Sequence, residues 1–164
     1  MTKFKMLSLD TSTTETGFAL FENGKLSKSG TIKVKGVEPS KRVDEMLSKL
    51  LILFAKEDPN LIVIEDLSVF NNMTTNKNLA EIIGCVRGYC VLQEIYFDRL
   101  APNKWRRLVA KEDETIPTKR KDCKEWDIKT LERYTDKKKK EVNDNEADAI
   151  LVGEAYNIMF GVEQ

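Results

Sequence analysis

The sequence predicts an α/β fold with a mixed five-stranded sheet flanked by helices, and two observations predict it. Near the N-terminus, three strand-like runs follow one another with short turns between them, as antiparallel strands do. Farther along, short apolar runs alternate with stretches of helical periodicity, as in a sheet whose parallel strands are connected by helices. The 164 residues contain no repeat or low-complexity boundary, so we expect one domain, residues 1–164.

The first three strands are expected at residues 4–9, 17–21 and 26–34. The first run is short and mostly apolar, which is typical of a strand buried on both faces, and Asp10 ends it. The dipeptide Asn23-Gly24 separates the second run from the third, and in that place it is a strong hairpin signal. The N-terminal part of the chain therefore predicts three antiparallel strands.

A helix, a strand, a second helix and a fifth strand are expected next. Apolar residues recur at helical spacing over residues 39–56, which predicts an amphipathic helix. The wholly apolar run 61–64 predicts a buried strand that ends in Glu65. A long helix is expected from about residue 76 to 96, and the fifth strand should end near residues 99–102.

Three acids stand in predicted elements from which their side chains can meet at one edge of the sheet. Asp10 and Glu65 each end a strand, and Asp148 lies in the last helix, expected from about residue 145 to 160, beside small residues that permit close approach to the sheet. Singly, each acid is as well explained as a cap or a turn residue. Together they indicate a site for two divalent cations, Mg²⁺ or Mn²⁺, which take oxygen ligands and promote phosphodiester cleavage.

The charges are unevenly distributed along a chain whose formal net charge is zero. The segment 103–140, which we expect to be largely helical, holds 14 Lys and Arg against 8 Asp and Glu, whereas the remainder holds 13 against 19. A basic segment beside an acidic site suits a polyanionic substrate such as DNA. The side chains expected to contact phosphates are those of Lys104, Arg106, Arg107, Lys119, Arg120, Lys121 and Lys124.

Two aromatic residues near these charges each have two interpretations. Trp105 is expected in the core, the commoner place for a tryptophan on a basic helix, with stacking on a base as the alternative. Phe70 lies in a polar linker after the second acidic strand, where it would either stack at a DNA branch point or cover the core. The four lysines at 137–140 are typical of a solvated loop.

The sequence contains no histidine and three cysteines, Cys85, Cys90 and Cys123, without metal-like spacing. The lack of histidine excludes Ser-His and Cys-His catalytic pairs, which leaves carboxylate–metal chemistry as the leading option. An odd number of cysteines gives no complete disulfide framework, so we expect a reducing cytoplasm. No apolar run approaches the length of a membrane span and the N-terminus is not signal-like, so we expect neither membrane insertion nor secretion.

Gly84 and Gly88 lie four residues apart on the long helix, which has apolar or small residues on nearly all sides. A helix that is apolar on more than one face needs more than one partner. Because glycine allows a second backbone to approach, we expect either a homodimer contact through this helix or, equally, packing on the chain's own sheet.

Five groups of motifs, in order along the chain, carry a resemblance to a known family. They are Leu7–Ser12 with Thr16–Ala19, Ile62–Glu65, Phe70–Asn72 through Gly84–Gly88, Ala101–Arg106 with Thr118–Lys121, and Ala147–Ile150. The set resembles the RuvC-type Holliday junction resolvases of the ribonuclease H-like superfamily, especially their phage branch. The likeness covers nearly the whole chain.

The resemblance implies a ribonuclease H-like fold and a homodimeric enzyme that binds a four-way DNA junction. Such an enzyme nicks two strands of like polarity, one per subunit, with two metal ions in each active site. By this resemblance Asp10 would bridge both metals, and Glu65 and Asp148 would each anchor one.

One position departs from the family pattern, which usually has a fourth acid three residues before the last Asp. That position is Asn145 here, whose amide oxygen is able to ligate Mg²⁺ but carries no charge. Asp144 lies four residues before Asp148 and near the same helical face, so it is the alternative fourth carboxylate. If neither Asn145 nor Asp144 acts as the fourth metal ligand, we expect weak nuclease activity or none.

Three other functions stay open. A non-catalytic protein that binds branched DNA would keep the fold and lack the fourth acid. A ribonuclease H-like enzyme would act on RNA–DNA hybrids, flaps or forks. The segment Asp10–Thr13 is also similar to the opening of ASKHA-type, sugar-kinase-like proteins and their tRNA-modification relative, but those proteins need a second Gly-rich phosphate loop, and the sequence has none.

Overall fold

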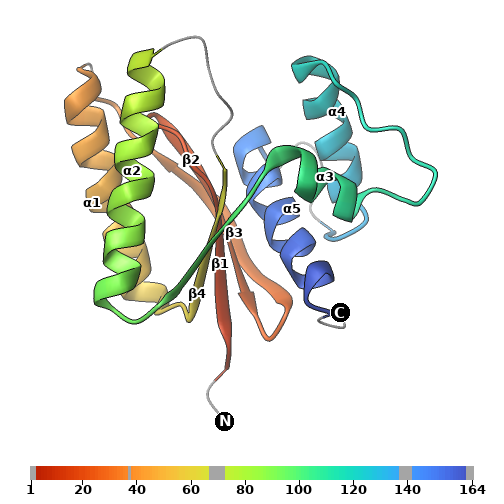
Figure 1. Cartoon of the computed structure of the whole chain (residues 1–164), viewed down its shortest axis with the longest axis horizontal. Helices are drawn as coiled ribbons and strands as arrows, with labels where there is room; N and C mark the ends of the chain where they lie inside the picture. Colours follow the sequence, from red (N-terminus) through yellow and green to blue (C-terminus); the bar gives the residue numbers. More distant parts are fainter. Residues whose placement is uncertain (1–2, 37, 67–72, 137–141, 162–164) are drawn as a thin grey trace.

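Helices cover both faces of one mixed sheet (Figure 1). The computed structural model describes residues 3–36, 38–66, 73–136 and 142–161. The strands are β1 (Lys5–Asp10), β2 (Glu15–Glu22), β3 (Lys25–Lys33), β4 (Leu61–Glu65) and β5 (Tyr96–Leu100). The helices are α1 (Pro39–Glu57), α2 (Met73–Leu92), α3 (Pro102–Val109), α4 (Arg120–Leu131) and α5 (Asp144–Met159). The predicted fold class, a mixed five-stranded sheet with flanking helices, is confirmed.

The topology of the sheet brings two of the three acids together. The strand order is β3-β2-β1-β4-β5, with β1, β2 and β3 antiparallel and β4 and β5 parallel to β1. Parallel neighbours end on the same side of a sheet, so the carboxyl ends of β1 and β4 meet at one edge. Leu9 pairs with Ile64, and the residues that follow them, Asp10 and Glu65, are therefore neighbours at that edge.

The turn between β2 and β3 is the predicted hairpin. Asn23 and Gly24 both have positive φ angles, 50° and 82°. Two successive residues with positive φ are what a tight two-residue hairpin turn requires, and Asn-Gly adopts this conformation at low cost. The hairpin prediction is confirmed.

The long helix ends earlier than the sequence predicts. Its expected end was near residue 96, but α2 ends at Leu92, and Glu94 takes a left-handed conformation with φ of 57°. Tyr96 is already the first residue of β5, which pairs with β4 along its length. Pairing between strands therefore overrides the helical pattern of this segment.

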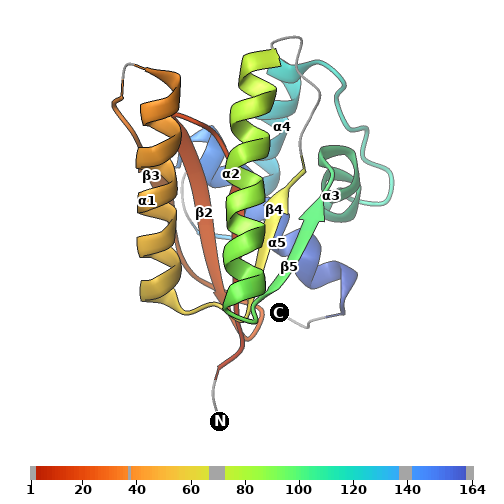
Figure 2. The ribbon, with the colours of Figure 1, turned by 60° about the vertical axis from the view of Figure 1, so that its left-hand side comes forward.

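Two hydrophobic clusters, one on each face of the sheet, form the core. α1 and α2 cover one face, onto which Leu7 and Leu9 of β1 point. α5, against which α3 and α4 pack, covers the other face, which receives Met6 (Figure 2). This alternation of side chains is the period of a β-strand. Within the described ranges, no helix has the length and apolar character needed to cross a membrane.

α5 lies very close to the sheet. The Ser8 hydroxyl donates to the carbonyl oxygen of Ala149 at 2.7 Å, and a Cβ atom on Gly153 would lie only 2.1 Å from the ring of Phe21. Larger side chains at these positions would force the helix outward. The prediction that small residues let the last helix approach the sheet is confirmed.

Glu154 of α5 is buried, and its burial predicts a pH-dependent stability. The side chain is 3% exposed, and burial raises its pKa from the ordinary 4.5 to about 7. The folded protein therefore keeps a proton that the unfolded chain releases, so the free energy of unfolding should fall as the pH rises from 4.5 to 7. Glu154→Gln is expected to raise this free energy by about 3 kcal/mol at about pH 8 and to change it little at about pH 4.

Urea unfolding at the two pH values measures this effect. Glu125→Gln, on the exposed side of α4, is the control and should change the stability at neither pH. A Glu154→Gln variant no more stable than the wild type at the higher pH would contradict the prediction.

Candidate active site

Asp10, Glu65 and Asp148 meet at the carboxyl edge of the sheet. Asp10 and Glu65 end β1 and β4, and each carboxyl group affects the pKa of the other. Asp148 lies early in α5, whose N-terminal end is at the same end of the molecule (Figure 1). All three line one cavity, whose volume is about 920 Å³. The structure thus brings together three acids that the sequence carries on separate elements.

Burial opposes the simultaneous ionisation of these three carboxyl groups. The pKa of Asp10 is raised well above its ordinary value, first by burial and then by the charge of Glu65. The pKa of Asp148 is also raised well above its ordinary value, by burial and then by the charges of Asp10 and Asp127. Burial raises the pKa of Glu65 as well, although hydrogen bonds with Trp105 and Asp10 act in the opposite direction. A cation bound among the carboxylates would favour their charged forms.

The chemistry of the side chains in the cluster fits a hard divalent cation. Carboxylate oxygens of Asp10, Glu65 and Asp148, together with the amide oxygen of Asn145, are the ligand type that Mg²⁺ and Mn²⁺ prefer. Among the residues that the structure describes, no three Asp, Glu, Cys or His side chains are arranged as a complete set of metal ligands.

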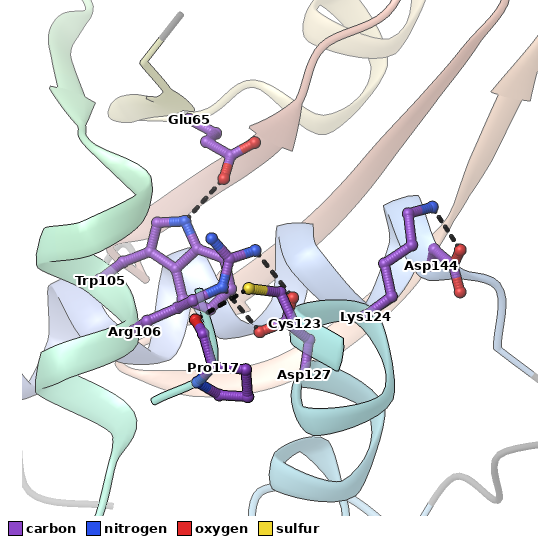
Figure 3. Close-up of polar contacts among 8 residues, drawn as sticks. All are labelled: Glu65, Trp105, Arg106, Pro117, Cys123, Lys124, Asp127 and Asp144. Atoms are coloured by element: carbon purple, nitrogen blue, oxygen red, sulfur yellow. Dashed lines mark hydrogen bonds and ion pairs between the residues drawn. The ribbon is translucent and has the colours of Figure 1, made fainter. Parts of the chain in front are cut away.

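The first turn of α5 presents Asn145, and not Asp144, to the cavity. Nδ2 of Asn145 donates to the carbonyl oxygen of Glu15 at 2.7 Å, so the amide oxygen is the atom left for a ligand role. The carboxylate of Asp144 pairs with Nζ of Lys124 at 2.5 Å (Figure 3). A Cβ atom on Gly17 would lie 1.8 Å from the carbonyl oxygen of Asn145, so glycine is what lets this turn lie against β2.

The residues predicted to contact phosphates fall into three groups. Arg106, Arg107 and Lys124 line the cavity with the acids. Lys104, Lys119 and Lys121 are exposed on and beside α3 and α4 and, among the described residues, are not part of the cavity lining. The side chain of Arg120, the residue Phe70 and the lysines 137–140 lie outside what the structure describes.

Arg106 is bonded to a buried carboxylate that the sequence analysis did not identify. Its Nε and Nη2 atoms donate to the two carboxylate oxygens of Asp127 at 2.9 and 2.8 Å (Figure 3). Asp127 is 1% exposed, and its charge is one of the causes that raise the pKa of Asp148. Burial acts to lower the pKa of Arg106, but the bonds and the charge of Asp127 outweigh it and raise that pKa. Arg106 thus supplies a fixed positive charge beside the acidic cluster.

The sequence contains a signal for Asp127 that the search for acids at strand ends overlooked. Asp127 lies four residues from Cys123 and from Leu131, on the inward face of α4. A carboxylate on such a face is rarely buried without a charged partner. The expectation that Trp105 lies in the core is confirmed, but its indole N–H also donates to Oε1 of Glu65 at 2.8 Å, which no single-residue pattern indicated.

Three solved structures share this fold over most of the chain. RuvC of T. thermophilus in complex with a Holliday junction substrate has a TM-score of 0.74 at 13% identity, over 96% of this chain and 95% of that one. A second structure of Thermus thermophilus RuvC has a TM-score of 0.70 at 12% identity, over 97% and 98%. The yeast mitochondrial Holliday junction resolvase Ydc2 has a TM-score of 0.67 at 11% identity, over 93% and 77%.

Sequence comparison adds no relative to these structural neighbours. No protein-family model matches the chain, and no curated protein sequence matches it. The structural likeness, at these low identities, establishes the architecture: this chain has the ribonuclease H-like fold of the RuvC resolvases.

Proposed function

We propose that this protein is a metal-dependent endodeoxyribonuclease that resolves four-way DNA junctions. The observation that carries the proposal is the cluster of Asp10, Glu65 and Asp148 in a cavity that is also lined by three basic side chains. Carboxylates that hold cations, next to Lys and Arg that hold phosphates, are the combination that hydrolysis of a nucleic acid backbone needs. The fold shared with RuvC, which has been solved with a Holliday junction substrate, supports the same class of substrate.

In the proposed site, the carboxylates of Asp10, Glu65 and Asp148 would hold the divalent cations. Bound Mg²⁺ or Mn²⁺ would supply activation of water and charge stabilisation at the leaving oxygen. The amide oxygen of Asn145 would add a neutral ligand. The products are expected to carry 5′-phosphate ends.

The basic side chains have two separate roles in this proposal. Arg106, fixed by Asp127, and Arg107 and Lys124 would hold the phosphates that enter the cavity. The exposed Lys104, Lys119 and Lys121 would bind the duplex arms without reading their sequence. Most of the DNA affinity should therefore come from residues that are not needed for the cleavage step.

A homodimer through α2 would provide the two active sites that paired nicks require. The alternative, that Gly84 and Gly88 pack on the chain's own sheet, does not hold, because a Cβ atom on either residue would have no described atom within 4 Å. Cys85 is also exposed on this helix, as are Val91 and Leu92, at 73% and 80%. The exposed glycines and apolar side chains support a second copy of the chain as the partner of this face.

Cys85 makes the dimer testable by cross-linking. It is exposed, whereas Cys90 is buried and Cys123 is partly buried with its thiol bonded to the carbonyl of Pro117. A short thiol-reactive bifunctional reagent should give a covalent dimer with the wild type and with Cys123→Ser, and none with Cys85→Ser. A wild-type protein that stays monomeric in sedimentation experiments would contradict the proposed interface.

Gly84→Gln should separate the dimer from the stability of the subunit. Glutamine is a better helix former than glycine by about 0.5–1 kcal/mol, and the added side chain meets open space in the isolated subunit. The variant is therefore expected to be monomeric but as well folded as the wild type, with paired nicks reduced to single ones.

The proposed function is tested by incubating a labelled four-way junction, a fork and a linear duplex with Mg²⁺, Mn²⁺ or EDTA. Cleavage of the junction that requires metal, with the duplex left intact, is the expected result. Equal cutting of the fork would make this protein an enzyme for branched DNA in general. Cleavage of none of the substrates would overturn the assignment as a nuclease.

One observation favours a second candidate, a protein that binds junctions without cutting them. Asn145 lies in the cavity and brings no charge to it, while the nearby carboxylate of Asp144 is paired with Lys124. If the wild type binds junctions tightly and nicks none, Asn145→Asp is the variant to test. Gain of metal-dependent nicking in that variant would assign the missing activity to this position.

A further inference from the structure

Trp105 of α3 lies directly against the acidic cluster. The residue is fully buried, and its indole N–H, the one polar group of the side chain, donates to Oε1 of Glu65 at 2.8 Å (Figure 3). Burial removes the indole from water, so the carboxylate of Glu65 is the partner that satisfies its N–H. A hydrogen bond to a carboxylate in such a place is stronger than one between neutral groups.

The position of this indole is fixed by the fold. Glu65 pairs with Leu100 in the last register of β4 and β5, and α3 begins two residues later at Pro102. The backbone N–H of Trp105 donates to the carbonyl of Ala101 at 3.0 Å, which sets the first turn of α3 above the end of β4. After β5 the chain therefore turns into α3, which places the indole of Trp105 beside the carboxylate of Glu65 at the end of β4.

The side chain of the next residue, Arg106, packs against a face of the Trp105 ring. The guanidinium carbon of Arg106 lies 4.3 Å from the ring centroid of Trp105. Two hydrogen bonds to the buried Asp127 of α4 fix that guanidinium in turn. Trp105 is thus a rigid donor, with one orientation of its N–H.

We propose that Trp105 is a positioning residue for Glu65: its N–H holds Oε1 and so leaves Oε2 for the cation site that Glu65 would form with Asp10. The inference rests on the proposed function, because the cation belongs to that function. Without the indole donor, Glu65 is able to turn either oxygen toward Asp10. Loss of one charged hydrogen bond should then weaken cation binding by about tenfold.

The chain contains a matched control for this bond. It has two tryptophans, and Trp126 of α4 is also buried and also donates its indole N–H to a glutamate, Oε1 of Glu114, at 3.1 Å. Glu114 is paired with Arg133 and does not line the cavity in the described part of the chain. Trp105→Phe and Trp126→Phe therefore each remove an indole N–H that donates to a glutamate, and only the first touches the acidic cluster.

The test is titration calorimetry of both variants with Mn²⁺ alone, followed by junction binding in EDTA and cleavage as a function of Mg²⁺. Trp105→Phe should raise the Kd for Mn²⁺ by about tenfold and Trp126→Phe by less than about twofold. Junction affinity in EDTA should be equal in the two variants. Cleavage by Trp105→Phe should need about ten times more Mg²⁺ but recover most of the maximal rate when Mg²⁺ is saturating. Equal Mn²⁺ affinities of the two variants would overturn the inference.

A second measurement keeps the inference testable if Trp105→Phe does not fold. The Trp126→Phe protein has a single indole N–H resonance, that of Trp105, and Mg²⁺ without DNA should shift it. An unmoved resonance at a Mg²⁺ concentration that saturates binding would overturn the inference. A wild type that binds no Mn²⁺ and cuts no junction would instead overturn the proposed function, so the two failures are distinguishable.

Discussion

Asp10→Asn is expected to abolish cleavage of four-way junctions, to leave their binding intact and to stabilise the metal-free protein. The substitution removes a central carboxylate from the proposed cation site but none of the Lys and Arg side chains around the cavity. We expect a loss of at least about a thousandfold in the cleavage rate, or about 4 kcal/mol of transition-state stabilisation. Time courses of nicking, together with junction binding in EDTA, measure the two effects separately.

The stability effect of Asp10→Asn follows from the pKa of this residue. Burial and the charge of Glu65 raise the pKa of Asp10, so ionising it costs the folded state free energy that the unfolded chain does not lose. The cost grows as the pH rises above the ordinary pKa of an aspartate, and the variant should therefore gain most over the wild type at alkaline pH. Asp44→Asn, which changes an exposed acid on α1, is the control for both measurements. A folded Asp10→Asn variant that fails to bind junctions, or still cuts them, would contradict the account.

Arg106→Met is expected to destabilise the protein by about 3–5 kcal/mol, because it leaves the carboxylate of Asp127 buried without its partner. Asp127 is 1% exposed, and burial raises its pKa even in the presence of Arg106. Without the guanidinium this pKa should rise further, so the destabilisation should be largest at high pH, where Asp127 must be charged. Urea unfolding at two pH values gives both the size and the sign of the effect.

The neighbouring arginine is the matched control for this prediction. Arg107 is exposed on the same helix, so Arg107→Met should change the free energy of unfolding by less than about 0.5 kcal/mol while lowering the affinity for DNA. The double variant Arg106→Met, Asp127→Asn should recover much of the stability, since both members of the buried pair are then neutral. Equal stabilities of the Arg106→Met and Arg107→Met variants would show that the pair is not a structural element.

The elements that the sequence predicts best are those whose patterns are local. Asn23 and Gly24 specify their turn by backbone preference alone, and the apolar run of β4 specifies a buried strand wherever it lies. The placement of Asp10 and Glu65 follows from these strands, because parallel neighbours place their ends together. The geometry of that edge was therefore predictable before the structure.

The elements that the sequence predicts poorly depend on contacts between distant segments. β5 is a half-exposed edge strand without a strong apolar run, and it is defined by its pairing with β4. The helical pattern of α2 continues past Leu92, and nothing local marks Glu94 as the residue that ends it. The bonds from Trp105 to Glu65 and from Arg106 to Asp127 likewise join residues far apart in the chain.

The measurement that tests the central claim most directly is mapping of the nicks on a four-way junction whose four strands are labelled in turn. With Mg²⁺, the account predicts two nicks, on opposite strands of like polarity and placed symmetrically about the branch point, each with a 5′-phosphate, and no nicks with EDTA or with Asp10→Asn. Nicks that fall on all four strands, or that persist in the Asp10→Asn protein, would contradict it.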